Sequence, residues 1–489
     1  MYEKLRYAKG VRRYAAIIAY FTGFVKTQTD MKTGAERFAE IRKSPFTFFR
    51  LCAIIQKTSK GDTTMPAQPS CPAYLRPLLS LFVAHGECAY PVGGCVRDTL
   101  MGVPPHDWDV AVTTPPETTV ALCEEAGYRT IPTGIKHGTI SVLVPHSGVP
   151  ADREGPYDLI ECTTCRTEGG YTDGRHPDRV DFTGDIRDDL SRRDFTVNAM
   201  AFAMELAADP ASETSALTVV DLFGGRRDLD AGIIRAVGDP DTRFREDALR
   251  LLRAVRFAVK LGFTIEEGTR AAVIREAAGL SRISRERISD EFQKILQSPR
   301  PEEGVAMLTE LGLMPYVLPR GISPEGMGNL SSLPADFAVR MACLQWGKDE
   351  EELRENLAGL RLSGAVYKRI TTLHASRFQP AEAAPRKARM WRHALGELAV
   401  PAVQIRLARG VGDGAELESL LSLIRCSEEL GEPVRIEDLN INGRDLIALG
   451  FTPGRLLQDI LCDLLDLIWD HPEKNSREEL IKEALKRKD

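Results

Sequence analysis

The chain has 489 residues, which is enough for roughly three or four domains with sizeable cores. Its 43% apolar and 27% charged residues are ordinary for a globular protein, and a formal net charge of −6 excludes a uniformly basic surface for nucleic acid. The charge is uneven, because residues 1–64 hold 13 Lys and Arg against 5 Asp and Glu. A nucleic-acid partner would therefore have to meet locally concentrated positive charge.

Residues 1–64 are predicted to form a poorly ordered N-terminal extension. Basic residues precede an apolar run at 14–25 that is too short to span a bilayer. A signal peptide or an organelle-targeting segment is an alternative, but no small-residue cleavage site follows before Lys26. We expect the functional part to start at Met65, and the extension to be dispensable or even untranslated.

The cysteines and histidines point away from a transition-metal site. The ten cysteines are scattered, and Cys162 and Cys165 form the one Cys-x-x-Cys pair. A second pair, which a zinc site would need, does not follow, and the eight histidines show no metal-ligand spacing. Free thiols are typical of a reducing compartment, and no segment is apolar enough to cross a membrane, so we expect a cytoplasmic protein.

The most informative stretch runs from Ala89 to Thr114, AYPVGGCVRDTLMGVPPHDWDVAVTT. An amphipathic helix at 72–85 is expected to lead into it. Within the stretch we predict a buried strand at 89–92, a glycine turn, a helix at 95–102 and a second strand at 108–112. The glycine turn would let a phosphate approach the backbone at the start of the helix.

The second strand carries Asp107 and Asp109. Alternate residues of a strand share a face, so both carboxylates are predicted to point into one site. Such a pair suits Mg²⁺, because hard cations take oxygen ligands and keep substrate phosphates in their shell. A lone Asp-x-Asp is usually a solvated turn, and this one gains weight from the Gly-Gly-x-Val-Arg-Asp that precedes it.

This arrangement, with Asp107 nine residues after Asp98, resembles the active-site motif of the class II tRNA nucleotidyltransferase and bacterial poly(A) polymerase family, within the DNA polymerase beta superfamily. The resemblance covers about residues 70–489 and is rich in motifs up to about residue 320. It implies that the two aspartates bind metal, and that Gly94 and Arg97 grip a triphosphate.

A helix at 116–126 and strands at 139–144 and 158–164 are predicted next. Glu161, on the last of these strands, is either a solvated residue or, by the resemblance, a third catalytic carboxylate. The glycine-rich segment 167–182 is predicted to be a mobile loop. It resembles the flexible loop of enzymes of this family that add A as well as C, and shortening it between Gly169 and Asp178 is expected to preserve C addition and impair A addition.

Residues 187–201, RDDLSRRDFTVNAMA, match the second motif of the family. We expect an apolar helix to begin at Phe195. The double arginine before it is either part of a solvated face or, by the resemblance, part of the nucleotide site. The resemblance places Arg193 at the triphosphate and Asp194 near the sugar.

A further helix is predicted from Glu246, apolar nearly all round. Its charged residues follow each other in steps of three: Asp247, Arg250, Arg253 and Arg256. A charged stripe on a buried helix must face a polar cavity or partner charges, so a buried ion-pair network is the alternative to a site. The stripe resembles the Glu-Asp-x-x-Arg motif of the family, which implies that these four residues bind the nucleotide and read its base.

The rest of the chain, from Ser281, is predicted to be helical, with little motif content between 330 and 435 and an amphipathic helix at 453–469. The expected fold is α+β, a small mixed α/β nucleotidyltransferase head followed by an all-helical neck, body and tail. The expected boundaries are an extension at 1–64, head at 70–205, neck at 206–300, body at 301–435 and a tRNA-binding tail at 436–489.

The function that the resemblance implies is Mg²⁺-dependent transfer of nucleotides from CTP and ATP to the 3′ end of tRNA, which builds or repairs its CCA terminus. An A-only enzyme and a bacterial poly(A) polymerase are alternatives, although Lys136-His137-Gly138-Thr139 stands where the latter usually carries Gly-Arg-Arg-Phe. A module that only binds RNA is disfavoured, because it has no use for carboxylates that face phosphate. The oligomeric state stays open, with a homodimer as one option.

Overall fold

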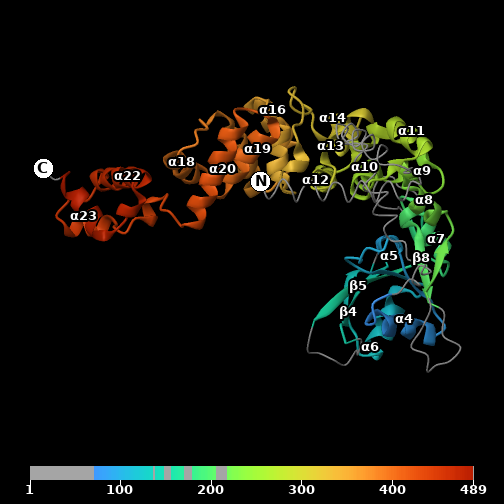
Figure 1. Ribbon diagram of the computed structural model, residues 1–489. Coiled ribbons are helices and arrows are strands. Elements are labelled where there is room, and N and C mark those ends of the chain that lie inside the picture. The colour runs from blue at the N-terminus through green and yellow to red at the C-terminus, as the bar shows by residue number, and fades with distance from the viewer. Residues whose placement is uncertain (1–70, 136–137, 148–155, 170–178, 205–216, 488–489) are drawn as a thin grey trace, which may run out of the picture. The chain divides into compact units, whose positions relative to one another are not determined.

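The computed structural model describes residues 71–487, apart from 136–137, 148–155, 170–178 and 205–216 (Figure 1). The chain divides into two units, residues 1–68 and 69–489, and the first unit lies outside the described residues. The predictions for the extension at 1–64 and for the centre of the 167–182 loop therefore fall outside them as well. In the described part, no helix has the length and apolar character that a membrane span requires.

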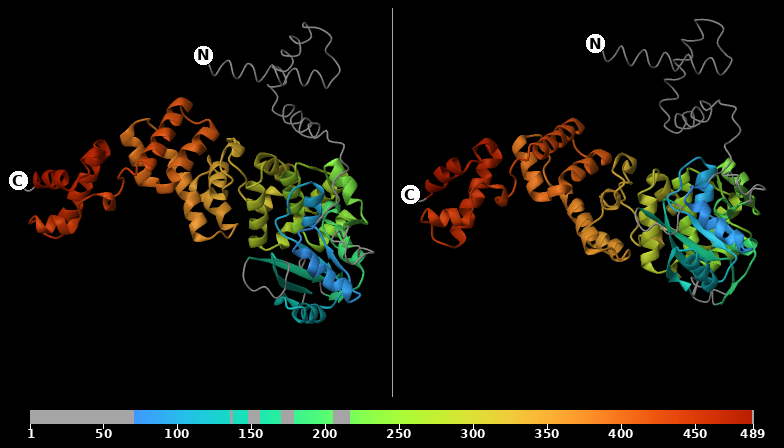
Figure 2. Two further views of the ribbon diagram at one scale, coloured as in Figure 1. Left: turned by 60° about the horizontal axis from the view of Figure 1, so that its bottom comes forward. Right: turned by 90° about the horizontal axis from the view of Figure 1, so that it is seen from below.

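The head is built on a five-stranded mixed sheet in the order β1-β2-β5-β4-β3. The strands are β1 (Ala89–Pro91), β2 (Asp109–Val112), β3 (Arg129–Gly134), β4 (Thr139–Pro145) and β5 (Tyr157–Thr164). Strands β2 and β5 run parallel, and the other neighbours are antiparallel. Helices α4 (Leu75–Ala84) and α6 (Pro116–Glu125) pack on this sheet through apolar side chains (Figures 1 and 2).

The head contains further elements besides this sheet and its two helices. They are α5 (Gly94–Leu100), the hairpin of β6 (Arg166–Gly169) and β7 (Arg179–Phe182), α7 (Ile186–Ser191), and the pair β8 (Met200–Met204) and β9 (Leu217–Asp221). The prediction of one loop over 167–182 was thus wrong at both ends. The helix predicted from Phe195 was also wrong, because a 3₁₀ turn at Thr196–Asn198 leads directly into a strand.

The neck contains α8 (Gly225–Ala231), α9 (Pro240–Glu246), α10 (Leu249–Leu261), α11 (Glu267–Glu276), α12 (Arg285–Leu296) and the short parallel pair β10 (Ile233–Ile234) and β11 (Thr264–Ile265). The helix predicted to run on from Glu246 is interrupted. Asp247 has an extended backbone, and its side chain accepts a 3.0 Å hydrogen bond from the backbone N–H of Leu249. A short acidic side chain that caps a helix in this way favours a break between α9 and α10.

The body is all helical. Its helices are α13 (Pro301–Glu310), α14 (Met314–Val317), α15 (Phe337–Leu344), α16 (Glu350–Ala358), α17 (Gly364–Ala375), α18 (Pro385–Leu395), α19 (Ala399–Arg409) and α20 (Gly414–Glu429). The tail helices are α21 (Gly443–Ala448), α22 (Arg455–Asp470) and α23 (Arg477–Leu485), which enclose a separate apolar core. The tail helix predicted at 453–469 is confirmed as α22.

Arginines buried in the body hold the carbonyl ends of helices. Arg340 is 4% exposed and donates to the carbonyls of Leu296, at the end of α12, of Ser298, at 2.8 Å, and of Leu333, at 3.1 Å. Burial lowers the pKa of its guanidinium. Arg406 binds the carbonyls of Ser376 and Arg377 in the same manner. Helix ends without internal partners are satisfied this way, and their partial negative charge favours a cation.

Replacing Arg340 with methionine is expected to lower the free energy of unfolding by about 2–4 kcal/mol, because three buried carbonyls lose their donors. Thermal and urea denaturation measure the change. The control is Arg354→Met, since Arg354 is exposed and its ion pair with Glu351, at 3.7 Å, lies at the surface. This control should cost less than about 0.5 kcal/mol. Equal effects of the two substitutions would contradict the clamp.

Candidate active site

The acidic edge of the head sheet comes from two parallel strands. Asp109 begins β2 and lies opposite Glu161 of β5 in the ladder. Asp107 comes before the strand, so the predicted alternation along one strand does not place it beside Asp109. All three side chains are exposed. Partial loss of hydration, with the negative charges of Asp107 and Glu161, nevertheless raises the pKa of Asp109 to about 6.

The donor set at this edge has the chemistry that a hard divalent cation prefers, namely carboxylate oxygens at an open surface. The three carboxylates repel each other when they are charged, and a bound cation would relieve this repulsion. Across the residues that the structure describes, however, no three His, Cys, Asp or Glu side chains are gathered at metal-ligating positions. The side chains are thus of the chemical type that binds a hard metal ion, and their arrangement around a metal is a proposal.

The glycine turn lies against Arg193. Gly93 has φ of +79°, and a Cβ placed on it would lie 2.6 Å from Nη1 of Arg193. Arg193 is itself anchored, because its Nε and Nη2 donate to Asp189 at 3.2 and 3.0 Å. Burial would raise the pKa of Asp189, but Arg193 and Arg192 outweigh it and lower that pKa. The absence of a side chain at Gly93 therefore makes room for Arg193.

Arg97, on α5, is buried, and its guanidinium is already bound within the protein. Its Nε donates to Asp98 at 2.8 Å, and its Nη1 donates to Oδ1 of Asn198 at 2.6 Å. Gly94, the first residue of α5, is 3.6 Å from Nη2 of Arg97, measured from an ideal Cβ. Arg193 is thus more open to a ligand than Arg97 is.

Asn198 continues this polar chain to Asp194. Its Nδ2 donates to Oδ1 of Asp194 at 3.1 Å, while Arg253 on α10 donates to Oδ2 at 2.7 Å. Burial would raise the pKa of Asp194, but Arg253 and Asn198 outweigh it and lower that pKa to about 2. The carboxylate therefore stays charged at neutral pH. Motif residues from α5, from the turn at 196–198 and from α10 are joined into one network.

The predicted stripe around α10 binds four different partners. Asp247 pairs with Arg287 of α12 at 2.7 Å, and Arg250 pairs with Glu246 at 2.6 Å. Arg250 also donates to the carbonyls of Arg243 and Arg192. Arg256 lies 2.8 Å from Glu291, and its guanidinium is 4.3 Å from the ring centre of Phe257. Each of the four side chains therefore has an oppositely charged partner within the protein, as the alternative of an ion-pair network predicts, and their role at the nucleotide stays a prediction.

Sequence reasoning missed two members of the site. Asn198 stood in a run taken for an apolar helix, and only the observation that it is the one polar residue between Val197 and Met204 could have singled it out. Arg287 comes from α12, 40 residues after its partner Asp247. No local pattern in one sequence pairs residues at that separation.

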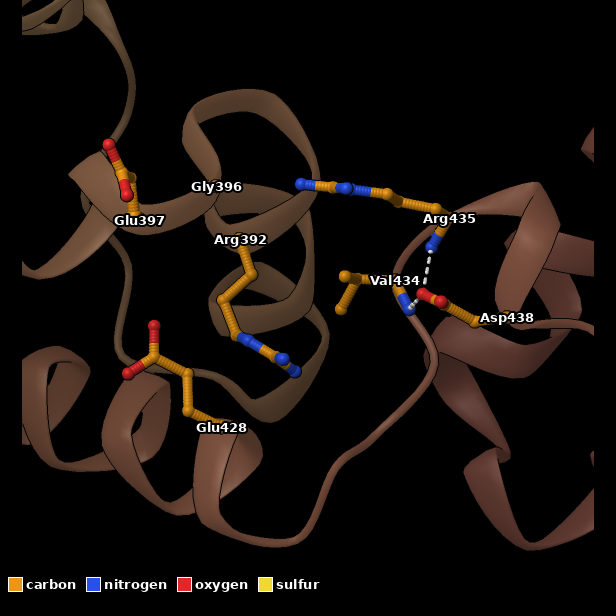
Figure 3. Close-up of a pocket in the computed structure, with 7 residues that line it drawn as sticks. All are labelled: Arg392, Gly396, Glu397, Glu428, Val434, Arg435 and Asp438. Carbon is orange, nitrogen blue, oxygen red and sulfur yellow. Dashed lines mark hydrogen bonds between the residues drawn. The ribbon is translucent and has the colours of Figure 1, made fainter.

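A pocket of about 260 Å³ occurs in a different part of the fold (Figure 3). It is lined by Arg392, Gly396, Glu397, Glu428, Val434, Arg435 and Asp438. The carboxylate of Asp438 accepts from the backbone N–H groups of Val434 and Arg435, at 2.9 and 2.8 Å. Acidic and basic side chains share its wall, and none of the predicted site residues lines it.

Replacing Gly93 with alanine is expected to displace Arg193, because the added methyl group would overlap its guanidinium. We expect nucleotide transfer to fall by roughly 10–100-fold, with a stability loss of about 1–2 kcal/mol from the left-handed backbone. Steady-state kinetics and thermal denaturation measure both. The control is Gly86→Ala, since Gly86 has the same φ of +79° with open space around it. An equal loss of activity in the control would contradict the role of Arg193.

Comparisons with known proteins agree with the arrangement of these motifs. The model of the poly(A) polymerase head domain matches residues 89–235, and that of the probable RNA and SrmB-binding site of polymerase A matches residues 262–322. The CCA-adding enzyme of Limosilactobacillus fermentum is 36% identical over 434 residues, which cover 86% of this chain and 98% of the relative. The CCA-adding enzyme of Enterococcus faecalis is 33% identical over 426 residues, 84% of this chain and 95% of the relative.

Solved structures show the same fold. The CCA-adding enzyme of Bacillus stearothermophilus, solved in complex with CTP, has a TM-score of 0.67 and 29% identity, covering 86% of this chain and 98% of that one. The Thermotoga maritima CCA-adding enzyme, complexed with tRNA, has a TM-score of 0.62 and 22% identity, covering 87% and 98%. Identity, coverage and fold together establish that this chain belongs to the CCA-adding enzyme family of tRNA nucleotidyltransferases.

Proposed function

We propose that this chain adds and repairs the 3′-terminal CCA of tRNA, using CTP and ATP without a nucleic-acid template and releasing pyrophosphate. The observation that carries the proposal is the joined network of Arg97, Asn198, Asp194 and Arg253 beside an acidic strand edge, in a chain whose relatives are aligned over nearly their whole length. A general RNA-binding module would need neither the carboxylates nor a buried network next to them.

The proposed chemistry uses Asp107, Asp109 and Glu161 to hold Mg²⁺. When bound, the metal would supply activation of the tRNA 3′-hydroxyl and neutralisation of charge on the departing pyrophosphate. Of the protein groups, Arg193 is the best placed to contact the triphosphate, because it is partly exposed, lies over Gly93 and contributes positive charge at Asp109. Gly94 offers backbone at the same turn.

Arg97, Arg253 and Arg256 complete the proposed nucleotide site. Their guanidinium groups lie 5.4, 5.4 and 4.3 Å from the ring centre of Phe257. The three guanidinium groups repel each other because all are positively charged. Their carboxylate partners Asp98, Asp194 and Glu291 partly offset this repulsion. A polyphosphate would add the negative charge that such a cluster attracts.

The division of labour that we propose follows the predicted boundaries. The head at 70–205 and the neck at 206–300 carry the chemistry and the base selection, the body at 301–435 connects them to the tail, and the tail at 436–489 grips tRNA. The enzyme would act in the cytoplasm, where its tRNA substrates are found.

The proposal is tested with purified protein and three tRNA transcripts that end before the CCA, after the first C and after the second C. Each is incubated with CTP, ATP or both, and products are resolved at single-nucleotide length. We expect two C additions from CTP alone, and A addition only after both are present. Addition of A alone would establish the A-only alternative, and long A tails would establish a poly(A) polymerase. No extension of any transcript would refute the proposal.

A further inference from the structure

We propose that Asn198 is a positioning residue of the nucleotide site, which sets Arg97 and Asp194 in register with each other before the nucleotide binds. This inference rests on the proposed function. The side chain of Asn198 is 6% exposed and makes two hydrogen bonds, from Arg97 Nη1 at 2.6 Å and to Asp194 Oδ1 at 3.1 Å. Both partners are charged, and they come from different segments of the chain.

The chemistry of the amide fixes its orientation. A guanidinium can only donate and a carboxylate can only accept, so the carbonyl oxygen must face Arg97 and the NH₂ group must face Asp194. An asparagine is the one residue of this length that offers an acceptor and a donor on a rigid plane. Its isostere aspartate would serve Arg97 but would place a second carboxylate against Asp194.

The surroundings show why the orientation of both partners matters. Asp194 Oδ1 also accepts from the backbone N–H of Phe195 at 2.8 Å, and Arg253 closes the other side. Arg97 lies against the Phe257 ring that also carries Arg253. Asn198 therefore connects Arg97 to Asp194, so that a displacement of the Arg97 guanidinium would also displace Asp194 and its partner on α10.

Another buried asparagine shows what a purely structural role looks like. Asn356 is fully buried, its Nδ2 donates to Gln345 and to the carbonyl of Gly321 at 2.6 and 3.0 Å, and its Oδ1 accepts from the backbone N–H of Arg320. Its partners are neutral, and none belongs to the nucleotide site. Asn356 is thus the control, because it is buried at least as deeply as Asn198 and its side chain makes three hydrogen bonds against two.

The test compares Asn198→Asp, Asn198→Ala and Asn356→Asp in the full chain. We expect both Asn198 variants to raise the KM for CTP and ATP at least tenfold, the aspartate more than the alanine, with kcat within threefold and the KM for tRNA unchanged. Calorimetric titration with a non-hydrolysable CTP analogue, without tRNA, should show the same loss. Asn356→Asp should lower the melting temperature and leave every KM within twofold.

A structural role would lower the melting temperature and kcat of the Asn198 variants and leave the nucleotide KM unchanged, which would overturn the proposal. Loss of folding in both Asn198 variants would overturn it as well, since Asn198 would then be required for the stability of the fold and not for positioning the nucleotide site. The titration without tRNA separates this inference from the proposed function. If wild-type protein binds the analogue but extends no tRNA, the proposed function fails while the role of Asn198 in nucleotide binding is still decided.

Discussion

Replacing Asp109 with asparagine is expected to lower nucleotide transfer by roughly 10³-fold or more, because an amide keeps the shape of the side chain but loses the charge that holds a divalent cation. Asp107→Asn and Glu161→Gln should have effects of similar size if the three side chains act together. Initial rates of CTP incorporation into tRNA, measured over a range of Mg²⁺ concentrations, give the change. Excess metal should recover little of it.

The matched control is Asp158→Asn. Asp158 lies on the same strand as Glu161, is half-buried, and pairs with His146 at 3.2 Å and with Tyr74 instead of facing the acidic edge. This variant should keep transfer within about threefold of wild type, since surface ion pairs contribute little. If Asp109→Asn also stays within tenfold of wild type, the assignment of the metal site to this edge is wrong.

Stability should move in the opposite direction to activity at Asp109. Its folded pKa is about 6, above the ordinary value of 3.8, so the charged form is less favoured in the folded protein than in the unfolded one. In metal-free buffer, that charge lowers stability above pH 6, and the loss disappears as the pH falls through the window from 6 towards 3.8. Asp109→Asn is therefore expected to keep or slightly raise the melting temperature at pH 7. A small effect is expected, because the side chain is exposed.

The elements that the sequence predicts well are those with a strong local signal. The strands at 139–144 and 158–164 and the helix at 116–126 agree with β4, β5 and α6 to within a residue or two. The strand β4 is an apolar run that ends at Pro145, and α6 begins at Pro116 and is followed by Gly127, so local preference marks their ends. The mixed α/β head followed by helices is confirmed on this basis and by the solved relatives.

The elements that sequence reasoning misjudged have signals that conflict. The run after Phe195 is short and apolar, and such a run does not distinguish a strand from a buried helix. The helix from Glu246 fails at Asp247 because side-chain capping competes with helix continuation. The parallel pairing that sets Asp109 opposite Glu161 depends on a chain crossing of about 50 residues, which no period within either strand records.

Contacts between distant segments explain the rest. The stripe of Asp247, Arg250, Arg253 and Arg256 could be read from its spacing, but the partners on α12 and at Asp194 could not. These partners decide what each arginine is free to do. Arg253 donates to Asp194, whereas Arg250 uses Nη1 twice and Nη2 once, so within the described residues three of its five N–H groups have an acceptor.

The second large effect that we expect is on the choice of base, when Asp247 or Arg250 is replaced. Cytosine and adenine both present an amino donor beside an unprotonated ring nitrogen, so a carboxylate and a guanidinium together can pair with either base. Uracil and guanine present a carbonyl beside a protonated ring nitrogen. The carbonyl, an acceptor, would then face the acceptor Asp247, and the ring N–H, a donor, would face the donor Arg250. Each buried mismatch costs about 1–3 kcal/mol, so two should reject UTP and GTP by roughly 10²–10⁴-fold.

In the structure Asp247 is held by Arg287, which would fix its side chain for the role that we propose. Both carboxylate oxygens accept from that guanidinium, at 3.3 and 2.7 Å, and Oδ1 also caps α10. Each carboxylate oxygen can accept more than one hydrogen bond, so an amino group of the base still finds an acceptor. Arg287 also fixes the orientation of the carboxylate, which makes a mismatch with uracil or guanine costly.

Asp247→Ala is therefore expected to reduce the rejection of UTP and GTP at least tenfold, and Arg250→Ala to lower kcat/KM for CTP and ATP by about 10–100-fold as well. The measurement is kcat/KM for all four nucleotides on each variant.

The control for the lost cap is Asp239→Ala, because Asp239 caps α9 by accepting from Thr242 at 2.9 Å and is exposed. Arg245→Ala, which breaks an exposed pair with Glu276, is the control for Arg250. If the two site variants reject UTP and GTP as strongly as their controls do, base choice lies elsewhere, and the charged stripe of α10 serves only to bind its partners within the protein.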